Sequence, residues 1–320
     1  MSEPAPLELL TIGRVSVDLY AEQLNVGVRD VKTFRKSIGG TAPNVAVAAA
    51  RLGRRAAVCT RVGDDEMGEY VRYALTETFG VDARFVATDP TLKTPLAFAV
   101  LDPPEDPRII FYREPRAPDM NLTMEDLDPQ VVTDVPILWI AASNLAYEPS
   151  RTTMHEILAR RGRRTHTVLD LDWRPMFWGS PADATAEIAP LLGQFTMAIG
   201  NRTECQIAVG SDDPDDAADR LLAHGLEAVI VKLGGDGVLV ADRHGLRQRV
   251  APVPVEVVCG LGAGDAFGGA LCHGLLSGWD LATIAHVANA AGAIVAARLM
   301  CADDMPTLAE VMAVAGPVPS

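Results

Sequence analysis

Short apolar runs alternate with amphipathic or alanine-rich segments along most of the chain. The apolar runs lie at 7–13, 55–63, 136–143, 165–172, 196–201 and 227–234, and the segments between them lie at 43–53, 67–79, 149–161, 180–193 and 213–224. Continuous apolar strands separated by helices are typical of a parallel sheet that is covered on both faces. We therefore expect an α/β fold with a doubly wound, mostly parallel sheet, and mostly helical chain from residue 263 onward.

Four further segments alternate apolar and polar residues and interrupt this pattern. They lie at 15–20, 30–36, 94–101 and 107–113, and the proline-rich DPPEDP at 102–107 suits a loop that joins the last two. We interpret them as a small antiparallel β-sheet that projects from the main domain as a lid, built from insertions after the first and third core strands. Residues 1–320 then form a single domain, with the lid insertions at about 15–36 and 92–114.

Composition narrows the function classes. The chain has 320 residues, 48% of them apolar, and a net charge of −14, which argues against nucleic acid or an anionic membrane as a partner. The five cysteines are widely spaced without a C-x-x-C pair, which indicates buried thiols in a reducing compartment. No apolar run is long enough to span a bilayer and MSEPAPLELL is not a signal peptide, so we expect a cytoplasmic protein.

The strongest local motif is GLGAGDAFGGAL at 260–271. Small residues lead directly into a helical run, so backbone N–H groups and the helix N-terminus favour a bound anion there. Asp265 lies beside that site and is a candidate proton acceptor, and the helix dipole is expected to lower its pKa. The alternative is a tight turn in which Gly268 and Gly269 serve close packing. The spacing matches neither a Walker P-loop nor a dinucleotide-binding motif.

A second glycine motif is SIGGTAPNVAVAAARLG at 37–53. Gly39 and Gly40 allow a ligand to approach the backbone closely just before a helix. Asn44, in the first turn of that helix, either hydrogen-bonds a polyol or caps the helix, and capping is the interpretation that the motif alone favours.

A third motif, VIVKLGGDGVLV at 229–240, is a buried strand, a glycine-rich turn and another strand. Lys232 and the glycines either border a nucleotide or form a plain hairpin at 235–237.

A fourth motif, GNRTECQIAVG at 200–210, places Asn201 and Glu204 one helical turn apart at the C-terminal end of a strand. Open α/β sheets bind ligands at that edge, but the same spacing is typical of a capping box, which is the interpretation that spacing alone favours.

The segment VLDLDWRPMFWG at 168–179 concentrates charge and aromatic residues. Arg174 follows a strand end that carries Asp170 and Asp172, and only 17 of the 320 residues are aromatic, three of them here. Arg174 either forms a structural ion pair with one of these aspartates or binds the carboxylate of a ligand in a charge-assisted, bidentate contact. Because 24 residues are arginine and four are lysine, a single arginine is weak evidence of function.

Together, the motifs resemble the ribokinase-like (PfkB) carbohydrate kinases over nearly the whole chain. G-G-x-x-x-N-x-A at 39–46, N-x-x-E at 201–204, K-x-G-G-x-G at 232–237 and G-A-G-D at 262–265 follow one another in the order usual in that family. The chain departs from the family at Cys259-Gly260, where Asp-Thr is usual, which puts in doubt any contact of those two side chains.

The resemblance implies ATP-dependent phosphorylation of a primary hydroxyl, with Mg²⁺ and a β-sheet lid. Asp265 would be the catalytic base, and the N–H groups of Gly262, Ala263 and Gly264 would stabilise the transferred charge. Asp18, Gly39, Gly40 and Asn44 would hold the sugar. The nucleotide, its phosphates and the metal would be bordered by Asp172, Asn201, Glu204 (the metal residue), Lys232, Gly234, Gly235, Gly237 and Asn289. The resemblance also allows a monovalent cation and a homodimer formed through the lid.

Within the family, the chain resembles kinases of linear sugar acids. Those enzymes carry an arginine at the position of Arg174 and a Tyr-Arg pair on the lid, here Tyr112 and Arg113 in FYRE. Further similarity lies in GRVSVDLYA at 13–21, DLDWRPMFW at 170–178 and CADDMPT at 301–307, which resemble enzymes that phosphorylate the C6 hydroxyl of a 2-deoxy-5-keto-gluconic acid in myo-inositol catabolism. The alternatives are a 2-keto-3-deoxygluconate kinase, or a fructokinase or ribokinase acting on a neutral sugar.

Overall fold

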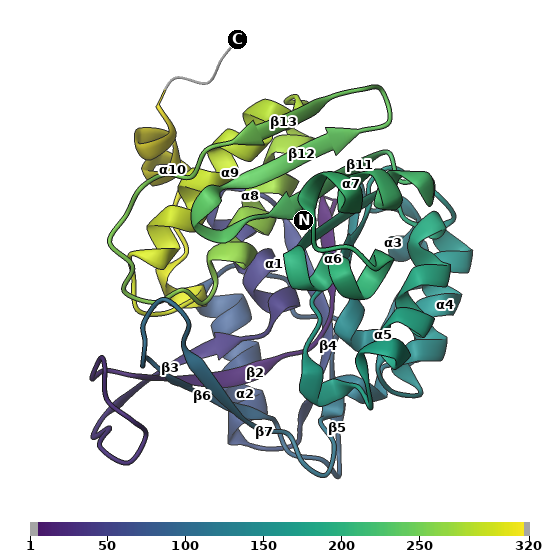
Figure 1. Ribbon diagram of the computed structural model, residues 1–320. Coiled ribbons are helices and arrows are strands. Elements are labelled where there is room, and N and C mark those ends of the chain that lie inside the picture. The colour runs from purple at the N-terminus through teal and green to yellow at the C-terminus, as the bar shows by residue number, and fades with distance from the viewer. Residues whose placement is uncertain (1–5, 317–320) are drawn as a thin grey trace.

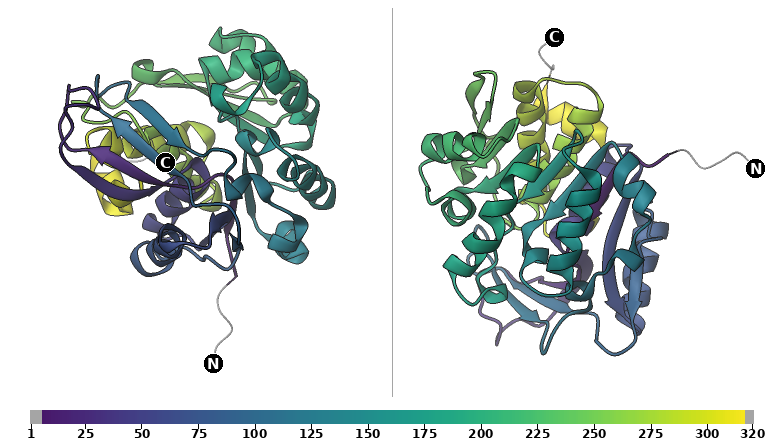
Figure 2. Two further views of the ribbon diagram at one scale, coloured as in Figure 1. Left: turned by 90° about the horizontal axis from the view of Figure 1, so that it is seen from below. Right: turned by 90° about the vertical axis from the view of Figure 1, so that its right-hand side faces the viewer.

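The computed structural model describes residues 6–316, so the interpretation of the first five residues lies outside it. Within that range the chain forms a large twisted sheet with helices on both faces and a smaller sheet beside it (Figures 1 and 2). This confirms the expected α/β class. No helix in residues 6–316 is long and apolar enough to cross a membrane.

The main sheet has nine strands in the order β13-β12-β11-β10-β9-β8-β1-β4-β5. All neighbours pair in parallel except β11 with β12 and β12 with β13, which are antiparallel. The strands are β1 (Leu9–Ile12), β4 (Ala56–Gly63), β5 (Val86–Asp89), β8 (Ile137–Ala141), β9 (Thr167–Asp170), β10 (Met197–Asn201), β11 (Ala228–Lys232), β12 (Val238–Asp242) and β13 (Arg247–Val250).

Six of these strands coincide with the six apolar runs, because strands buried on both faces are apolar throughout. The prediction did not include β5 or β13. Both are edge strands of four residues, and β13, with the sequence RQRV, is mostly exposed, so neither has an apolar run to mark it.

Helices cover the two faces and enclose two hydrophobic clusters. One cluster packs under α1, α2, α8, α9 and α10, and the other under α3 to α7. The helices are α1 (Thr41–Arg51), α2 (Glu66–Tyr73), α3 (Pro129–Asp134), α4 (Ser150–Arg161), α5 (Pro181–Ile188), α6 (Arg202–Val209), α7 (Pro214–Ala223), α8 (Ala263–Leu276), α9 (Leu281–Ala296) and α10 (Leu308–Ala315). Trp139 of β8 is fully buried against α8, where a Cβ on Gly268 would lie 2.9 Å from its ring.

The lid is a four-stranded sheet in the order β3-β2-β6-β7. Its strands are β2 (Ser16–Ala21), β3 (Phe34–Gly39), β6 (Leu96–Val100) and β7 (Arg108–Tyr112). The expectation of a purely antiparallel lid is wrong, because β2 and β6 pair in parallel. The two insertions follow β1 and β5, which run in the same direction in the main sheet, so the strands that continue from them also run in the same direction. The homodimer expected through the lid stays a prediction.

Candidate active site

The N-terminus of α8 lies between two cavities. Gly262 is its N-cap residue with φ +81°, and no side chain among residues 6–316 caps the helix. A Cβ on Gly262 would lie 2.5 Å from the Sγ of Cys301, so both the backbone conformation and the close packing require glycine. The first N–H groups of a helix have no intrahelical partner, so those of the first turn here remain available to an anion.

Asp265, in the first turn of α8, is held by Asn44 of α1. The Nδ2 of Asn44 donates a hydrogen bond of 2.7 Å to Oδ2 of Asp265. Asn44 therefore does not cap its helix as the motif alone suggested, and Gly40 occupies the N-cap position. Burial raises the pKa of Asp265 to about 6, although the bond from Asn44 opposes the rise. The expectation that the helix dipole would lower this pKa is wrong, because desolvation outweighs it.

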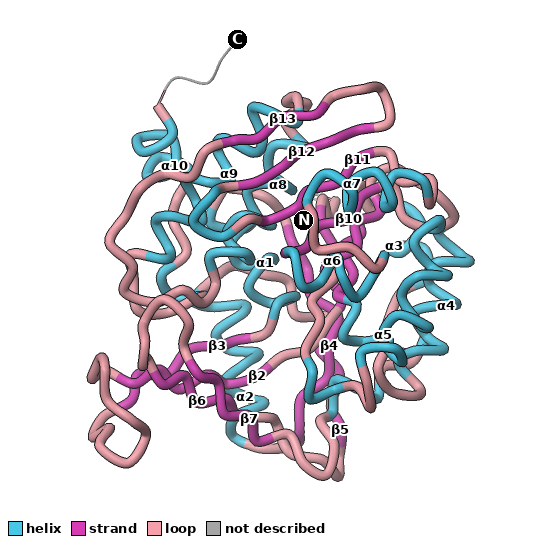
Figure 3. The backbone as a smooth tube through the Cα atoms, viewed as in Figure 1, coloured by secondary structure: helices cyan, strands magenta, loops and turns pink. Residues whose placement is uncertain are grey.

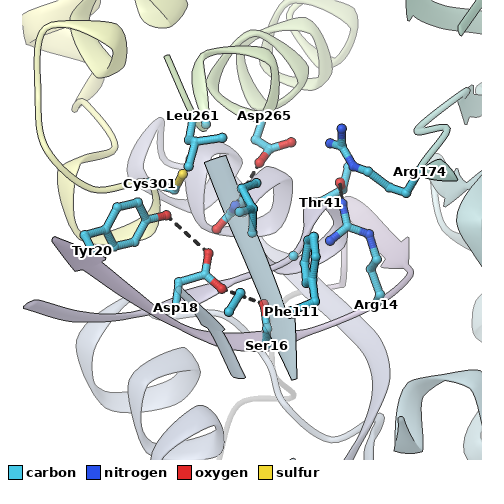
Figure 4. A pocket seen from close by; sticks show the side chains of 15 residues that line it. Arg14, Ser16, Asp18, Tyr20, Thr41, Phe111, Arg174, Leu261, Asp265 and Cys301 are labelled. Atoms are coloured by element: carbon cyan, nitrogen blue, oxygen red, sulfur yellow. Dashed lines mark hydrogen bonds between the residues drawn. The ribbon is translucent and has the colours of Figure 1, made fainter. Parts of the chain in front are cut away.

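The first cavity, the lid pocket, lies between the lid and α8, and Figure 4 shows its lining. Asp18 of β2 accepts hydrogen bonds from Ser16 Oγ (2.6 Å) and Tyr20 Oη (3.2 Å). A Cβ on Gly39 would lie 2.0 Å from a carboxylate oxygen of Asp18, which explains the glycine at that position. Its neighbour Gly40, with φ +101°, passes against the backbone of residue 14. In Figure 4, Asp18 lies on one side of the pocket and two arginines lie on the other, with Asp265 above.

The two arginines share the carboxylate of Asp172. Arg14, which follows β1, donates from Nε to Oδ2 (3.1 Å) and from Nη2 to Oδ1 (3.0 Å). Burial alone would raise the pKa of Asp172, but the two arginines outweigh it, so this pKa lies well below its usual range. The Nε of Arg174 lies 3.2 Å from Oδ1 of Asp172, but it forms no hydrogen bond with any residue in 6–316. The structural ion pair considered for Arg174 is thus present but loose, and the side chain lines the lid pocket. Asp172 was expected to border the nucleotide, but it does not line the second cavity, described below.

Tyr112 and Arg113 do not line the lid pocket. Side chains alternate along β7, so Phe111 faces the pocket and Tyr112 faces outward, where it is 62% exposed with its ring against Phe98. The guanidinium of Arg113 is buried in an ion pair with Asp119 and also donates to the carbonyl oxygen of Val15 (3.1 Å). The structure thus does not bring the lid Tyr-Arg pair to the site.

The second cavity, which we call the glycine-loop cavity, lies on the other side of the α8 N-terminus. It is lined by the turn at 234–237, by the loop 251–262 between β13 and α8 (Figure 3), and by α8 and α9. Ala263, Gly264 and Asn289 also line it, and Asn289 donates to the carbonyl oxygen of Ala251 (2.9 Å). The hairpin considered for 235–237 is present, and its glycines border this cavity as well.

Lys232, at the end of β11, lies among carboxylates next to the α8 N-terminus. Its Nζ is 3.8 Å from Oε2 of Glu204, and a Cβ on Gly264 would lie 3.4 Å from the same Nζ. Burial alone would lower the pKa of Lys232, but the negative charges of Glu204 and Asp170 outweigh burial and raise it. Asn201 and Glu204 form the capping box that their spacing favoured, and strand pairing sets Asn201 beside Lys232.

Sequence reasoning missed several pocket residues, above all Arg14, Ser16, Tyr20, Thr41 and Phe111. The segment GRVSVDLYA contains three of them and was noted only as a similarity, because the role of Arg14 depends on a partner 158 residues away. Asp170 was also missed as a site residue. Asp170 is 5% exposed, and burial raises its pKa. Lys232 opposes this rise, whereas the negative charges of Asp172 and Glu204 add to it.

Comparisons with known proteins agree with this geometry. A profile described as pfkB family carbohydrate kinase matches residues 7–308. A protein of Photobacterium profundum named 5-dehydro-2-deoxygluconokinase is 34% identical over 316 residues, which are 96% of this chain and 94% of that protein. A protein of Bacillus cereus named 5-dehydro-2-deoxygluconokinase 2 is 32% identical over 321 residues, which are 97% of this chain and 95% of that protein.

Solved structures share the fold. The crystal structure of fructokinase from Vibrio cholerae O395 in its fructose, ADP and calcium ion bound form is 26% identical, with a TM-score of 0.84 over 97% of this chain and 99% of that chain. That of a PfkB protein from Polaromonas sp. JS666 is also 26% identical, with a TM-score of 0.79 over 96% of this chain and 99% of that chain. The ribokinase-like architecture with its lid is confirmed.

Proposed function

This chain belongs to the pfkB family of carbohydrate kinases, and from that membership we propose that it transfers the γ-phosphoryl group of ATP to the C6 hydroxyl of 5-dehydro-2-deoxy-D-gluconate. The curated relatives that bear the name of this activity are 31–34% identical over nearly their full length. The observation that carries the proposal is the α8 N-terminus, which borders both the lid pocket and the glycine-loop cavity.

The geometry supports direct transfer between the two cavities. ATP would occupy the glycine-loop cavity, with its phosphates toward the N–H groups of residues 262–264. The sugar would occupy the lid pocket, with its C6 hydroxyl at Asp265. Asp265 accepts the hydroxyl proton as the oxygen bonds to phosphorus and the bond to the departing ADP breaks. Phosphoryl transfer depends on positioning and charge stabilisation, so a carboxylate with a pKa of about 6 is an adequate base.

An acid substrate is supported by the charges of the lid pocket. Two guanidiniums, those of Arg14 and Arg174, lie at one side; Asp172 accepts hydrogen bonds from Arg14, whereas the Nε of Arg174 is only in ion-pair distance of it. Arg174 lines the pocket, and a carboxylate is the group that a guanidinium binds in a directional, charge-assisted contact. A neutral sugar offers Arg174 no such contact.

Asp170 and Glu204 fit a Mg²⁺ ion that accompanies the nucleotide. No group of three or more His, Cys, Asp or Glu side chains in residues 6–316 forms a metal site, but Mg²⁺ commonly takes one or two carboxylates together with phosphate and water oxygens. Asp170 and Glu204 are buried carboxylates, 5% and 4% exposed, that both face Lys232. These two carboxylates would hold the ion, which would offset the negative charge of the phosphates. The monovalent cation stays a prediction.

A substrate panel in a coupled ADP-release assay tests the proposal. The panel contains 5-dehydro-2-deoxygluconate, 2-keto-3-deoxygluconate, fructose and ribose, and the position of the new phosphate is read by NMR. We expect kcat/KM for the first acid to exceed that for either neutral sugar by about 100-fold, the order of one charge-assisted hydrogen-bonded contact. We expect Arg174→Ala to remove most of that preference while leaving ATP affinity unchanged, and Arg220→Ala, an exposed arginine of α7, to remove none. A higher kcat/KM for fructose or ribose would refute the sugar-acid assignment and leave the family intact.

A further inference from the structure

Asp172 is contacted very unequally by its two arginines. Arg14 makes two hydrogen bonds to it, while Ser143 Oγ adds a third of 2.7 Å. The Nε of Arg174 approaches Oδ1 of Asp172 to 3.2 Å but forms no hydrogen bond with a described residue. The carboxylate of Asp172 is therefore hydrogen-bonded to Arg14, whereas Arg174 lies near it as an ion pair without a hydrogen bond from its Nε.

Burial reinforces this difference. The side chains of Arg14 and Asp172 are 6% and 2% exposed, whereas that of Arg174 is 38% exposed. A charge pair interacts more strongly where water is excluded, so the Arg14–Asp172 pair is the tighter of the two. Arg14 is further fixed by a hydrogen bond of 3.1 Å from Nη2 to Thr41 Oγ1. It cannot turn toward a ligand without breaking these contacts.

We propose that Arg14 is a positioning residue for substrate specificity: by occupying Asp172 it keeps the guanidinium of Arg174 free to bind the carboxylate of the substrate. This inference rests on the proposed function and concerns how the same pocket selects acids. It assigns Arg14 an indirect role, through Asp172, and not a contact with the substrate.

The proposal follows from what Asp172 would do without Arg14. A buried carboxylate that loses its partner is strongly destabilised, and it takes the nearest available cation. That cation is Arg174, whose Nε already lies 3.2 Å away, so a small side-chain rotation gives a bidentate pair. Arg174 would then be neutralised, and an incoming carboxylate would meet a pair with no net charge. Selection of acids over neutral sugars would be lost although Arg174 remains in place.

Four enzymes test this: wild type, Arg14→Met, Asp172→Asn and the double variant Arg14→Met/Asp172→Asn. The readouts are KM and kcat for the sugar acid, kcat/KM for fructose, the Kd of ATP by calorimetry and the thermal midpoint. We expect Arg14→Met to raise the KM for the acid by roughly 10- to 100-fold, the order of one charge-assisted contact, while the Kd of ATP changes less than about twofold. We expect the double variant to recover most of the affinity for the acid, because no carboxylate is left to bind Arg174.

The double variant decides between the indirect role and the alternatives. If Arg14 contacts the substrate itself or merely packs the pocket, adding Asp172→Asn will not lower the KM for the acid, and the proposal is overturned. It is also overturned if Arg14→Met leaves the acid-to-fructose ratio unchanged. Should Arg14→Met fail to fold, the double variant is compared with Asp172→Asn. If Arg14 acts only through Asp172, its removal leaves the KM for the acid unchanged in that background, and a rise of about 10-fold or more overturns the proposal. A wild-type enzyme without acid preference refutes the proposed function, whereas wild-type preference without rescue refutes only the role of Arg14.

Discussion

The pKa of Asp265 is set by two opposing influences, its hydrogen-bonded position in the first turn of a helix and its burial. The first turn of a helix favours its ionised form, and so does the hydrogen bond from Asn44, but burial favours the neutral form and prevails. The pKa of this carboxylate, the proposed base, therefore lies at about 6 and not in the usual range of an aspartate.

The pH dependence of kcat/KM follows from that balance. Because the pKa of Asp265 is raised to about 6 in the free enzyme, we expect kcat/KM to rise with pH through about 6 and to level off above it. Asn44→Leu removes the hydrogen bond that lowers the pKa of Asp265, so in this variant the rise of kcat/KM should move to higher pH. We expect Asp265→Asn to lower kcat by about 10²- to 10⁴-fold, the usual contribution of a general base. A wild-type profile that is flat between pH 5 and 8, or an active Asp265→Asn enzyme, would exclude Asp265 as the base.

At the scale of elements, the lid loop at 102–107 docks onto the loop that precedes α8. The N–H group of Gly260 donates a hydrogen bond of 3.0 Å to the carbonyl oxygen of Pro104. A Cβ on Gly260 would lie 2.4 Å from the carbonyl oxygen of Glu105, and Glu105 also lines the glycine-loop cavity. The glycine at 260, where the family usually has Thr, thus has a physical reason: it lets the backbone of the lid loop approach the α8 N-terminus.

Substitution of Gly260 tests this docking. In Gly260→Thr the new Cβ collides with backbone, so we expect the free energy of unfolding to fall by about 1–3 kcal/mol, as in other overpacked sites. Limited proteolysis should cleave the 102–107 loop faster than in the wild type. Gly235→Ala is the matched control, because a Cβ there meets nothing within 4 Å. Equal protease resistance of the Gly260→Thr and wild-type proteins would show that the loop does not depend on this contact.

At the scale of the whole molecule, the lid shares its core with the main sheet. Val17, Tyr20 and Ile38 of the lid are fully buried in the same hydrophobic cluster as residues of α1 and α8. The four short strands of the lid bury these side chains against the main domain, and short strands need a packed hydrophobic face to be stable in water. The lid and the main domain are therefore expected to fold as one unit, in line with the single domain expected from the sequence.

Cooperative unfolding in denaturant tests that unit. We expect far-UV circular dichroism, tryptophan fluorescence and the deuterium uptake of lid peptides from 16–21 and 34–39 to give the same midpoint. The four tryptophans all lie outside the lid strands, and Trp139 is fully buried in the main sheet, so their fluorescence follows the main domain. Loss of protection in the lid peptides at a clearly lower denaturant concentration would show instead that the lid is a separate unit.

The sequence alone determined most of the fold and the location of the site. Strands buried on both faces are apolar throughout, so six core strands could be predicted from local pattern, whereas β5 and β13 at the sheet edges could not. The glycine motifs likewise mark backbone conformations that side chains exclude, as at Gly262, and so locate the α8 N-terminus.

Only the tertiary structure decided how the site is charged. Three features depend on segments that are far apart in the chain. They are the parallel pairing of β2 with β6, the burial that raises the pKa of Asp265, and the pairing of Arg14 with Asp172. Local pattern carries information about neighbours within a few residues, but burial and long-range contacts arise only when the chain is folded. Arg174 could therefore be noticed in the sequence, while the reason it remains available, an arginine 160 residues before it bound to the same aspartate, is a property of the fold.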